Sequence, residues 1–281
     1  MPAELMSVLV LAAVVGLCVG SFLNVVIHRL PQMLEREWQA QSAEPSDETS
    51  KPVERYNLVV PRSRCPACGH RLAALENIPV ISYLFLRGHC RACNAPISAR
   101  YPIVELLTAA LTVAAIVRFG ATPTGIAASV FLWMLVALTF IDFDTLFLPD
   151  NLTLPLLWAG LLANVCGAVP SVSLRAAVIG AIAGYLVLWL IYWAFKLIRG
   201  KEGMGYGDFK LLAALGAWLG WQMLPLIVVL SSVVGAAIGI SLVLFKRHDR
   251  ENPLPFGPYL AIAGAIALFF GKPLVALYLP G

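Results

Sequence analysis

The chain carries little charge. Only 13% of its 281 residues are Asp, Glu, Lys or Arg, whereas 59% are hydrophobic. Because a soluble globular domain has about 25% charged residues, this composition excludes an ordinary soluble protein and predicts a polytopic membrane protein. The formal net charge is only +4, which does not indicate the basic surface that nucleic-acid binding requires, so we expect no nucleic-acid partner.

The first apolar run, residues 6–27, has no basic residue in front of it. A secretory signal peptide begins with positive charge and ends at a cleavage site of small residues. Here the positive charge follows the run, at Arg29. The sequence therefore predicts an uncleaved transmembrane helix over residues 1–28, with its N-terminus outside the cytoplasm and Arg29 inside it.

Further apolar runs, separated by short polar loops, predict seven more spans of about 20 residues each. The longest run, residues 211–245, has 35 residues without a charge. One helix of that length would overshoot the bilayer, and Gly220, Gln222 and Pro225 supply a break, so two helices are expected there. The other runs are residues 101–117, 126–141, 152–170, 176–195 and 260–279. The predicted fold is an all-α polytopic membrane protein with about eight transmembrane helices.

The distribution of positive charge predicts the topology. With the N-terminus outside, the cytoplasmic segments are residues 29–100, 142–150, 196–210 and 246–258, which hold 17 of the 20 Lys and Arg. Cytoplasmic loops of membrane proteins are rich in these two residues, so we expect this orientation. Asp142 ends one span and Asp208 begins another, 66 positions later, and both are therefore expected at the cytoplasmic face.

The predicted cytoplasmic insert, residues 29–100, lies between the first and second spans and has two parts. Residues 39–54 are polar and lack the apolar side chains of a core, which predicts a flexible segment. Residues 59–100 are rich in Pro, Cys and Gly, with short apolar pieces, which indicates a compact module. Residues 101–281 are predicted to form a seven-helix membrane domain.

Four cysteines of the module follow the pattern C-x2-C-x21-C-x2-C. They are Cys65, Cys68, Cys90 and Cys93. Each C-x2-C pair places two thiolates on one side of a tetrahedral ion, so the two pairs predict a closed structural zinc site. Two redox pairs or free thiols are the alternative, although disulfides are disfavoured in the cytoplasm. Four protein ligands leave no open position on the metal, which argues against a catalytic zinc.

Three other residues have a weaker bearing on metal binding. His70 is a second possible ligand, and more simply a solvated loop residue. Cys18 and Cys166 lie in apolar runs, and we interpret them as small core residues.

The acidic residues at the predicted membrane edges suggest chemistry. Asp208 follows three glycines and precedes an apolar run, and Asp142 ends another. Ionisable groups at membrane depth usually face a cavity or a partner and have a function there. Two neighbouring carboxylates that share a proton are what an aspartic protease needs, because one takes a proton from water while the other polarises the carbonyl. The glycines leave bare backbone in front of Asp208, against which an extended substrate can lie.

Each acidic residue also has a purely structural interpretation. Asp208 fits a helix cap that the helix dipole favours, and Asp150 fits a helix N-cap. Asp142 and Asp144 fit solvated loop residues. Glu105, near the cytoplasmic edge of the second predicted span, is either a snorkelling edge residue or part of a substrate or cofactor site, and we favour the edge interpretation.

Several segments together resemble the bacterial prepilin peptidases, also called type IV prepilin leader peptidases or type II secretion prepilin peptidases. They are residues 20–31 (GSFLNVVIHRLP), the four-cysteine module with residues 77–83 (NIPVISY) and 101–105 (YPIVE), residues 141–150 (IDFDTLFLPD), residues 205–210 (GYGDFK) and residues 255–258 (PFGP). The order and spacing of these segments extend over nearly the whole chain.

The resemblance implies an aspartic endopeptidase of the bacterial inner membrane. Such enzymes remove a short basic leader from prepilins and pseudopilins, after a Gly and before a Phe, and then methylate the new N-terminal amine with S-adenosylmethionine. Carried over by motif, the catalytic residues are Asp142 and Asp208, since Asp142 lies seven residues before Pro149. Asp144, a second acid two residues away, departs from the pattern. The implied partners are these substrates and membrane lipid.

The sequence lacks a Gly-rich strand-turn-helix signature for a nucleotide-like ligand, so S-adenosylmethionine rests on the resemblance alone and no residues are predicted to bind it. Two other functions remain open. One is a protease of the same Gly-x-Gly-Asp type that acts on other membrane proteins. The other is a transporter with Asp142, Glu105 and Asp208 as ion sites, although the matched repeats typical of transporters are not evident.

Overall fold

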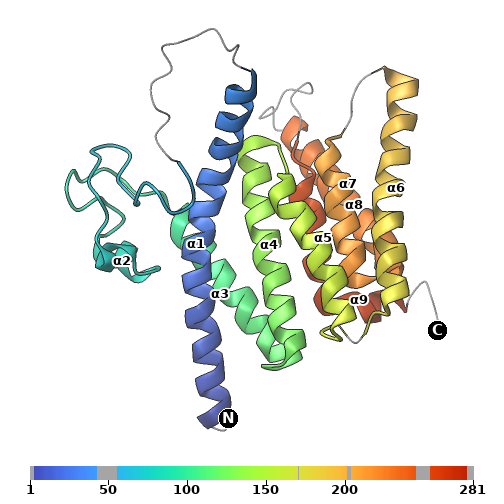
Figure 1. Ribbon diagram of the computed structural model, residues 1–281, viewed down its shortest axis with the longest axis horizontal. Helices are drawn as coiled ribbons and strands as arrows, with labels where there is room; N and C mark the ends of the chain where they lie inside the picture. The colour runs from blue at the N-terminus through green and yellow to red at the C-terminus, as the bar shows by residue number, and fades with distance from the viewer. Residues whose placement is uncertain (1–2, 43–55, 170, 201–203, 245–253, 277–281) are drawn as a thin grey trace. The chain divides into compact units, whose positions relative to one another are not determined.

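The computed structural model describes residues 3–42, 56–169, 171–200, 204–244 and 254–276 (Figure 1). Within these ranges the regular structure is helical, and the only β-type pairings are two isolated bridges. The chain divides into two compact units, residues 1–114 and 115–281. The prediction of an all-α membrane protein with a four-cysteine cluster is confirmed.

Five helices in the described residues are long and apolar enough to cross a membrane. They are Ala3–Ser42 (α1), Arg100–Phe119 (α3), Pro123–Thr145 (α4), Leu174–Arg199 (α6) and the segment Trp221–Leu242, which contains most of α8 (Leu224–Leu244). The other long helices are α5 (Asp150–Val165), α7 (Tyr206–Leu219) and α9 (Gly257–Val275). The count of eight transmembrane helices stays a prediction.

Helices α1 and α3 pack closely in the first unit because two glycines of α1 face the α3 backbone. A Cβ atom at Gly16 would lie 2.6 Å from Ala109 Cα, and one at Gly20 would lie 2.7 Å from Glu105 Cα. Small residues spaced four apart let two membrane helices approach in this way.

Helix α1 is longer than the predicted first span. It continues past the predicted boundary at residue 28 and ends at Ser42. Residues 39–42 of the segment predicted to be flexible are therefore helical, and residues 43–54 of that segment lie outside the described residues. The apolar run ends at Ile27, but the residues that follow it continue the helix through Pro31.

Helix α7 is the central helix of the second unit. Every residue from Leu211 to Leu219 is buried, and the helix packs against α5, α6 and α9 (Figure 1). Gly180 of α6 and Gly216 of α7 contact each other through their backbones. Gly220, with φ 82°, ends α7, and the short 3-10 turn η2 (Trp221–Met223) leads into α8. The predicted break between two helices at this point is confirmed.

Candidate aspartic site and four-cysteine module

The two predicted catalytic aspartates are buried at helix ends in the second unit. Asp142 lies in the last turn of α4 and Asp208 in the first turn of α7, and the two residues are 4% and 7% exposed. The interpretation of Asp142 as a solvated loop residue is therefore wrong. Asp208 lies in the first turn of α7, where the helix dipole favours an anion as predicted, although the N-cap position itself belongs to Gly205.

Buried contacts with Leu148 bring the segments of the two aspartates together. A Cβ atom at Gly207, next to Asp208, would lie 2.7 Å from Leu148 Cβ. A Cβ atom at Gly257 would lie 3.0 Å from Leu148 Cδ1. The backbone N–H of Gly257 in turn donates a hydrogen bond of 3.0 Å to Asp142 Oδ2. Leu148 thus packs against the neighbour of Asp208 and against the residue that binds Asp142.

The end of α4 and the starts of α5, α7 and α9 therefore meet at one end of the second unit (Figure 1). Three of the motif segments, residues 141–150, 205–210 and 255–258, supply these helix ends. The sequence placed the two aspartates at a common face. The sequence did not predict that Leu148 packs between these segments or that Gly257 donates a hydrogen bond to Asp142.

An ion pair joins the starts of α5 and α7. Lys210 Nζ lies 2.6 Å and 2.8 Å from the two carboxylate oxygens of Asp150. The N-cap of α5 is Pro149, so the predicted capping role of Asp150 is wrong, and Asp150 occupies the first helical turn instead. Lys210 was missed as a partner because 60 positions separate it from Asp150.

The glycines before Asp208 have different surroundings. At Gly205, the nearest atom that an added Cβ would meet is Asp208 Oδ2, at 3.9 Å, which is ordinary contact distance. At Gly207, Leu148 occupies the space of a side chain. Gly203 lies outside the described residues. Bare backbone beside the carboxylate is thus a property of Gly205, whereas Gly207 is required by packing.

A Gly207→Ala variant is expected to lower the free energy of unfolding by about 1–3 kcal/mol, the usual cost of overpacking a buried site. Alanine favours a helix over glycine by about 1 kcal/mol, but Leu148 is only 4% exposed and has no room to withdraw, so overpacking dominates. Thermal unfolding in detergent measures the effect. Gly205→Ala, two positions earlier, is the matched control, and equal stability of the two variants would contradict this account.

Asp144 and Glu105 differ from the predicted pair. Asp144 is exposed near the end of α4. Glu105, in the first unit, is 8% exposed, and its Oε2 accepts a 2.7 Å hydrogen bond from the N–H of Val80. The interpretation of Glu105 as a snorkelling edge residue is therefore wrong, because this carboxylate binds the chain just before the short helix α2 (Ile81–Phe85).

The four cysteines of the module form one cluster whose Sγ atoms all lie within 4.8 Å of one another. The Sγ atoms of Cys65 and Cys93 are 3.8 Å apart, and those of Cys68 and Cys90 are 4.0 Å apart. A tetrahedral zinc ion with Zn–S bonds of about 2.3 Å separates its sulfurs by about 3.8 Å. The four thiols therefore fit a metal of this size and geometry.

The two C-x2-C pairs have the same backbone conformation. The N–H of Cys65 donates to His70 O and the N–H of Gly69 to Cys65 O, and the second pair repeats both bonds, from Cys90 to Ala95 O and from Asn94 to Cys90 O. Gly69 and Asn94, which follow the two pairs, have φ 72° and 60°. Glycine permits the tight turn after the first pair, and Asn94 is its equivalent after the second, since Asn tolerates this conformation.

Backbone N–H groups favour the thiolate form in both pairs. Those of Cys68 and Ala67 lower the pKa of the Cys65 thiol to about 7. Those of Cys93 and Ala92 likewise lower the pKa of the Cys90 thiol. Burial and the neighbouring thiols instead raise the pKa of Cys68 to about 12, so the backbone favours one thiolate, the form that binds metal, in each pair.

Glu76 links the two halves of the module. Its Oε2 lies 3.1 Å from His70 Nε2, next to the first cysteine pair, and its Oε1 lies 3.9 Å from Arg91 Nη1, between the cysteines of the second. The N–H of Ala73 and the His70 side chain hold the pKa of Glu76 below its usual range. His70 thus pairs with a carboxylate and is not part of the cysteine cluster.

The remaining two cysteines are not core residues. Cys18 and Cys166 are both exposed, so their interpretation as small buried residues is wrong. An apolar run in a membrane helix places some side chains against lipid as well as against protein, and the two cannot be separated by hydrophobicity alone.

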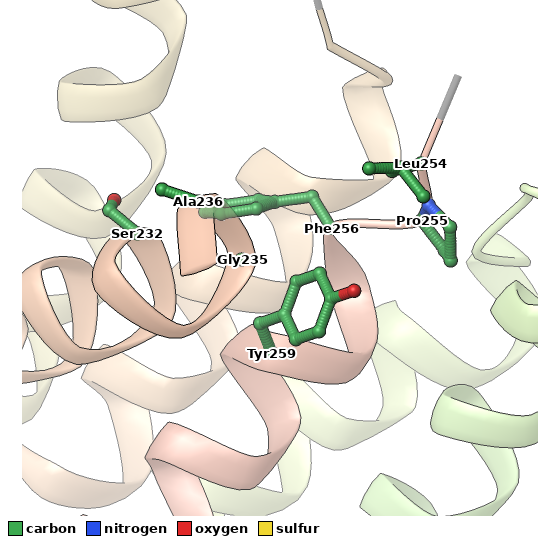
Figure 2. A pocket seen from close by; sticks show the side chains of 7 residues that line it. All are labelled: Ser232, Gly235, Ala236, Leu254, Pro255, Phe256 and Tyr259. Atoms are coloured by element: carbon green, nitrogen blue, oxygen red, sulfur yellow. The ribbon is translucent and has the colours of Figure 1, made fainter. Parts of the chain in front are cut away.

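A cavity of about 260 Å³ lies between α8 and the start of α9 (Figure 2). It is next to the segment whose residue Gly257 donates a hydrogen bond to Asp142. Ser232, Gly235 and Ala236 of α8 form one side, and Phe256 and Tyr259 form the other, with Leu254 and Pro255 at its edge. Phe256 directly precedes Gly257, whose N–H binds Asp142. The cavity wall is therefore one residue from the contact made by this carboxylate.

Comparison with known proteins gives a consistent result over the length of the chain. Residues 14–119 match the bacterial peptidase A24 N-terminal domain, and residues 129–240 match the type IV leader peptidase family. A prepilin leader peptidase/N-methyltransferase of Aeromonas hydrophila is 63% identical over 268 residues, which cover 94% of this chain and 91% of the relative. Proteins of the same name from Burkholderia pseudomallei (strain 1026b) and Pseudomonas aeruginosa are 57% and 53% identical.

The alignment with the Burkholderia protein covers 96% of this chain and 87% of the relative, and that with the Pseudomonas protein covers 94% and 91%. No solved structure matches the chain. The two family models together cover most of the residues, and both compact units contain matched segments. The chain therefore belongs to the type IV leader peptidase family.

Proposed function

We propose that this protein is a bifunctional prepilin leader peptidase and N-methyltransferase of the bacterial inner membrane, with Asp142 and Asp208 as its catalytic pair. The observation that carries the proposal is the burial of both carboxylates at one end of the second unit, on segments that meet at Leu148. The names of relatives up to 63% identical over most of the chain support the same two activities.

The chemistry of the proposed pair follows from its burial. Two neighbouring carboxylates do not both ionise readily, so one keeps a proton. The ionised group takes a proton from water as the water attacks, and the protonated group polarises the scissile carbonyl. The N–H of Gly257 holds one oxygen of Asp142, which orients this carboxylate. The open backbone at Gly205 leaves space for an extended substrate beside Asp208.

The proposed substrates are prepilins and pseudopilins. Such a substrate has a basic leader in the cytoplasm and an apolar helix in the bilayer, so its scissile Gly-Phe bond lies at the cytoplasmic boundary. The proposed topology places the N-terminus in the periplasm and the aspartates and the module at the cytoplasmic face, in line with the charge distribution. A negatively charged site also suits a substrate whose leader is positive.

We propose that Cys65, Cys68, Cys90 and Cys93 hold a structural zinc ion. The sulfur spacing and the two matching backbone turns support this assignment. The ion would join two halves of a module that buries few apolar side chains. S-adenosylmethionine is the proposed methyl donor for the second reaction.

We assign the apolar side chain after the scissile bond to the cavity beside Phe256. An Ala236→Phe variant would fill it, and cleavage of a substrate with Phe at this position is expected to fall about tenfold or more, the usual effect of a steric change in an apolar subsite. The Ala236→Phe variant should cleave a substrate with Ala after the scissile bond at nearly the rate of the wild-type enzyme. Rates for the two substrates, compared in detergent, give the measurement.

Val233→Phe is the matched control, because Val233 lies on the same helix, is 61% exposed and does not line the cavity. If Ala236→Phe lowered the cleavage rate of both substrates equally, or if both variants lowered it equally, the cavity would not be part of the substrate site.

A coupled assay on a purified prepilin tests the proposed function. Mass spectrometry would follow first the loss of the leader and then a gain of one methyl group on the new N-terminus, with and without S-adenosylmethionine. Cleavage of many membrane peptides without a basic leader would favour a broader protease. Ion flux in liposomes without any cleavage would favour a transporter.

A further inference from the structure

Helix α2 presents an apolar face for which the described residues provide no cover. Ile81, Leu84 and Phe85 are 49%, 67% and 85% exposed, and their spacing puts all three on one side of the helix. Tyr83 points elsewhere, because its hydroxyl lies 3.0 Å from where a Cβ atom of Gly88 would be. A cluster of exposed apolar side chains of this kind usually marks a contact surface.

The position of α2 along the long helices indicates what it contacts. Val80, directly before α2, donates its N–H to Glu105, which lies five residues inside α3. Five helical residues rise about 7.5 Å and the Glu105 side chain leans back toward the helix N-terminus, so α2 begins up to about that far below Arg100 along the α3 axis. Gly20, which packs against Glu105 Cα, belongs to the apolar run of α1. The start of α2 is thus level with the apolar parts of two candidate membrane spans.

We propose that Ile81, Leu84 and Phe85 insert into the lipid leaflet on the side of Arg29 and Arg100, so that the four-cysteine module rests on the bilayer. Apolar faces of interfacial helices enter about 5–10 Å into the boundary between headgroups and acyl chains, and the depth of α2 falls in this range. Arg87, exposed two residues after Phe85, adds a cation suited to an anionic headgroup. The partner is lipid.

This contact gives the Asn77–Tyr83 motif a role that the proposed reaction does not use. The hydrogen bond from Val80 to Glu105 fixes the start of α2 on α3, and the apolar face then fixes the module against the membrane surface. The inference depends on membrane insertion of α1 and α3 and does not depend on the peptidase activity.

Photo-crosslinking in the full-length protein tests the contact. p-Benzoylphenylalanine replaces Phe85, the protein is reconstituted into vesicles of phosphatidylglycerol and phosphatidylethanolamine, and adducts are identified by mass spectrometry after irradiation. We expect lipid adducts at position 85 in several-fold higher yield than at position 37. Glu37 is the control because it is exposed on α1, eight residues beyond Arg29.

The same label at position 84 repeats the test in case the change at Phe85 impairs folding. Equal lipid yields at positions 85 and 37 would overturn the proposal. Adducts to another segment of this chain, or to a second copy of it, would also overturn it and would identify the face as a protein contact. Because no substrate is present, a failure here leaves the proposed peptidase function unaffected.

Discussion

Asp208→Asn and Asp142→Asn are each expected to reduce leader cleavage by about 100- to 10,000-fold, the range that a general acid or base contributes. Asparagine has nearly the shape of aspartate but neither takes nor gives the proton. Initial rates of prepilin cleavage by the purified variants in detergent measure the loss. Thermal unfolding should show no loss of stability, because each substitution replaces one member of a buried carboxyl pair that disfavours ionisation of its partner.

Asp144→Asn is the matched control, since Asp144 lies on the same helix two residues from Asp142 and is exposed. Its cleavage rate should stay within a few-fold of wild type. An inactive Asp144→Asn variant beside an active Asp142→Asn variant would transfer the catalytic role to Asp144. Full activity of both variants of the buried pair would exclude an aspartic mechanism at this site.

Cys90→Ser is expected to remove the bound metal and unfold the module. Structural zinc in small domains contributes about 10–16 kcal/mol of apparent binding free energy near pH 7, far more than a module with so few buried apolar side chains supplies otherwise. Metal analysis of the purified protein should fall from one zinc per chain to nearly none. Limited proteolysis should then cut within residues 59–100 much faster than in the wild type.

Cys166→Ser and His70→Ala are the controls for metal binding. Cys166 is an exposed cysteine outside the cluster, and His70 pairs with Glu76, so both variants should keep the full metal content. Loss of metal in His70→Ala would make this histidine a ligand. A folded wild-type protein without zinc would refute the assignment of the four cysteines.

The sequence predicted the features that depend on local pattern. Apolar runs located every long helix in the described residues, Gly220 marked the break between α7 and α8, and the spacing of cysteines identified the cluster. Positive charge then predicted a common face for Asp142 and Asp208, and both lie at one end of the second unit. These signals work because each is a periodicity, a breaker or a short spacing that the chain carries locally.

The contacts that order the site depend on residues far apart in the chain. Gly257 donates to Asp142 across 115 positions, and Lys210 pairs with Asp150 across 60. Glu105 shows the same limit, because an acid near a helix end fits a snorkelling residue until its partner, Val80, is known. Helix α1 was predicted too short for a related reason. The end of an apolar run indicates where contact with lipid ends, but the helix itself continues to Ser42.

The bond between Gly257 and Asp142 also bears on the order of events during biosynthesis. Asp142 emerges from the ribosome more than a hundred residues before the backbone amide that holds it. A growing chain that has inserted α4 and α7 already contains both carboxylates, but Asp142 lacks its hydrogen-bond donor until α9 follows. We therefore expect the orientation of Asp142 to be completed only when α9, the last described helix, has joined the other helices of the second unit.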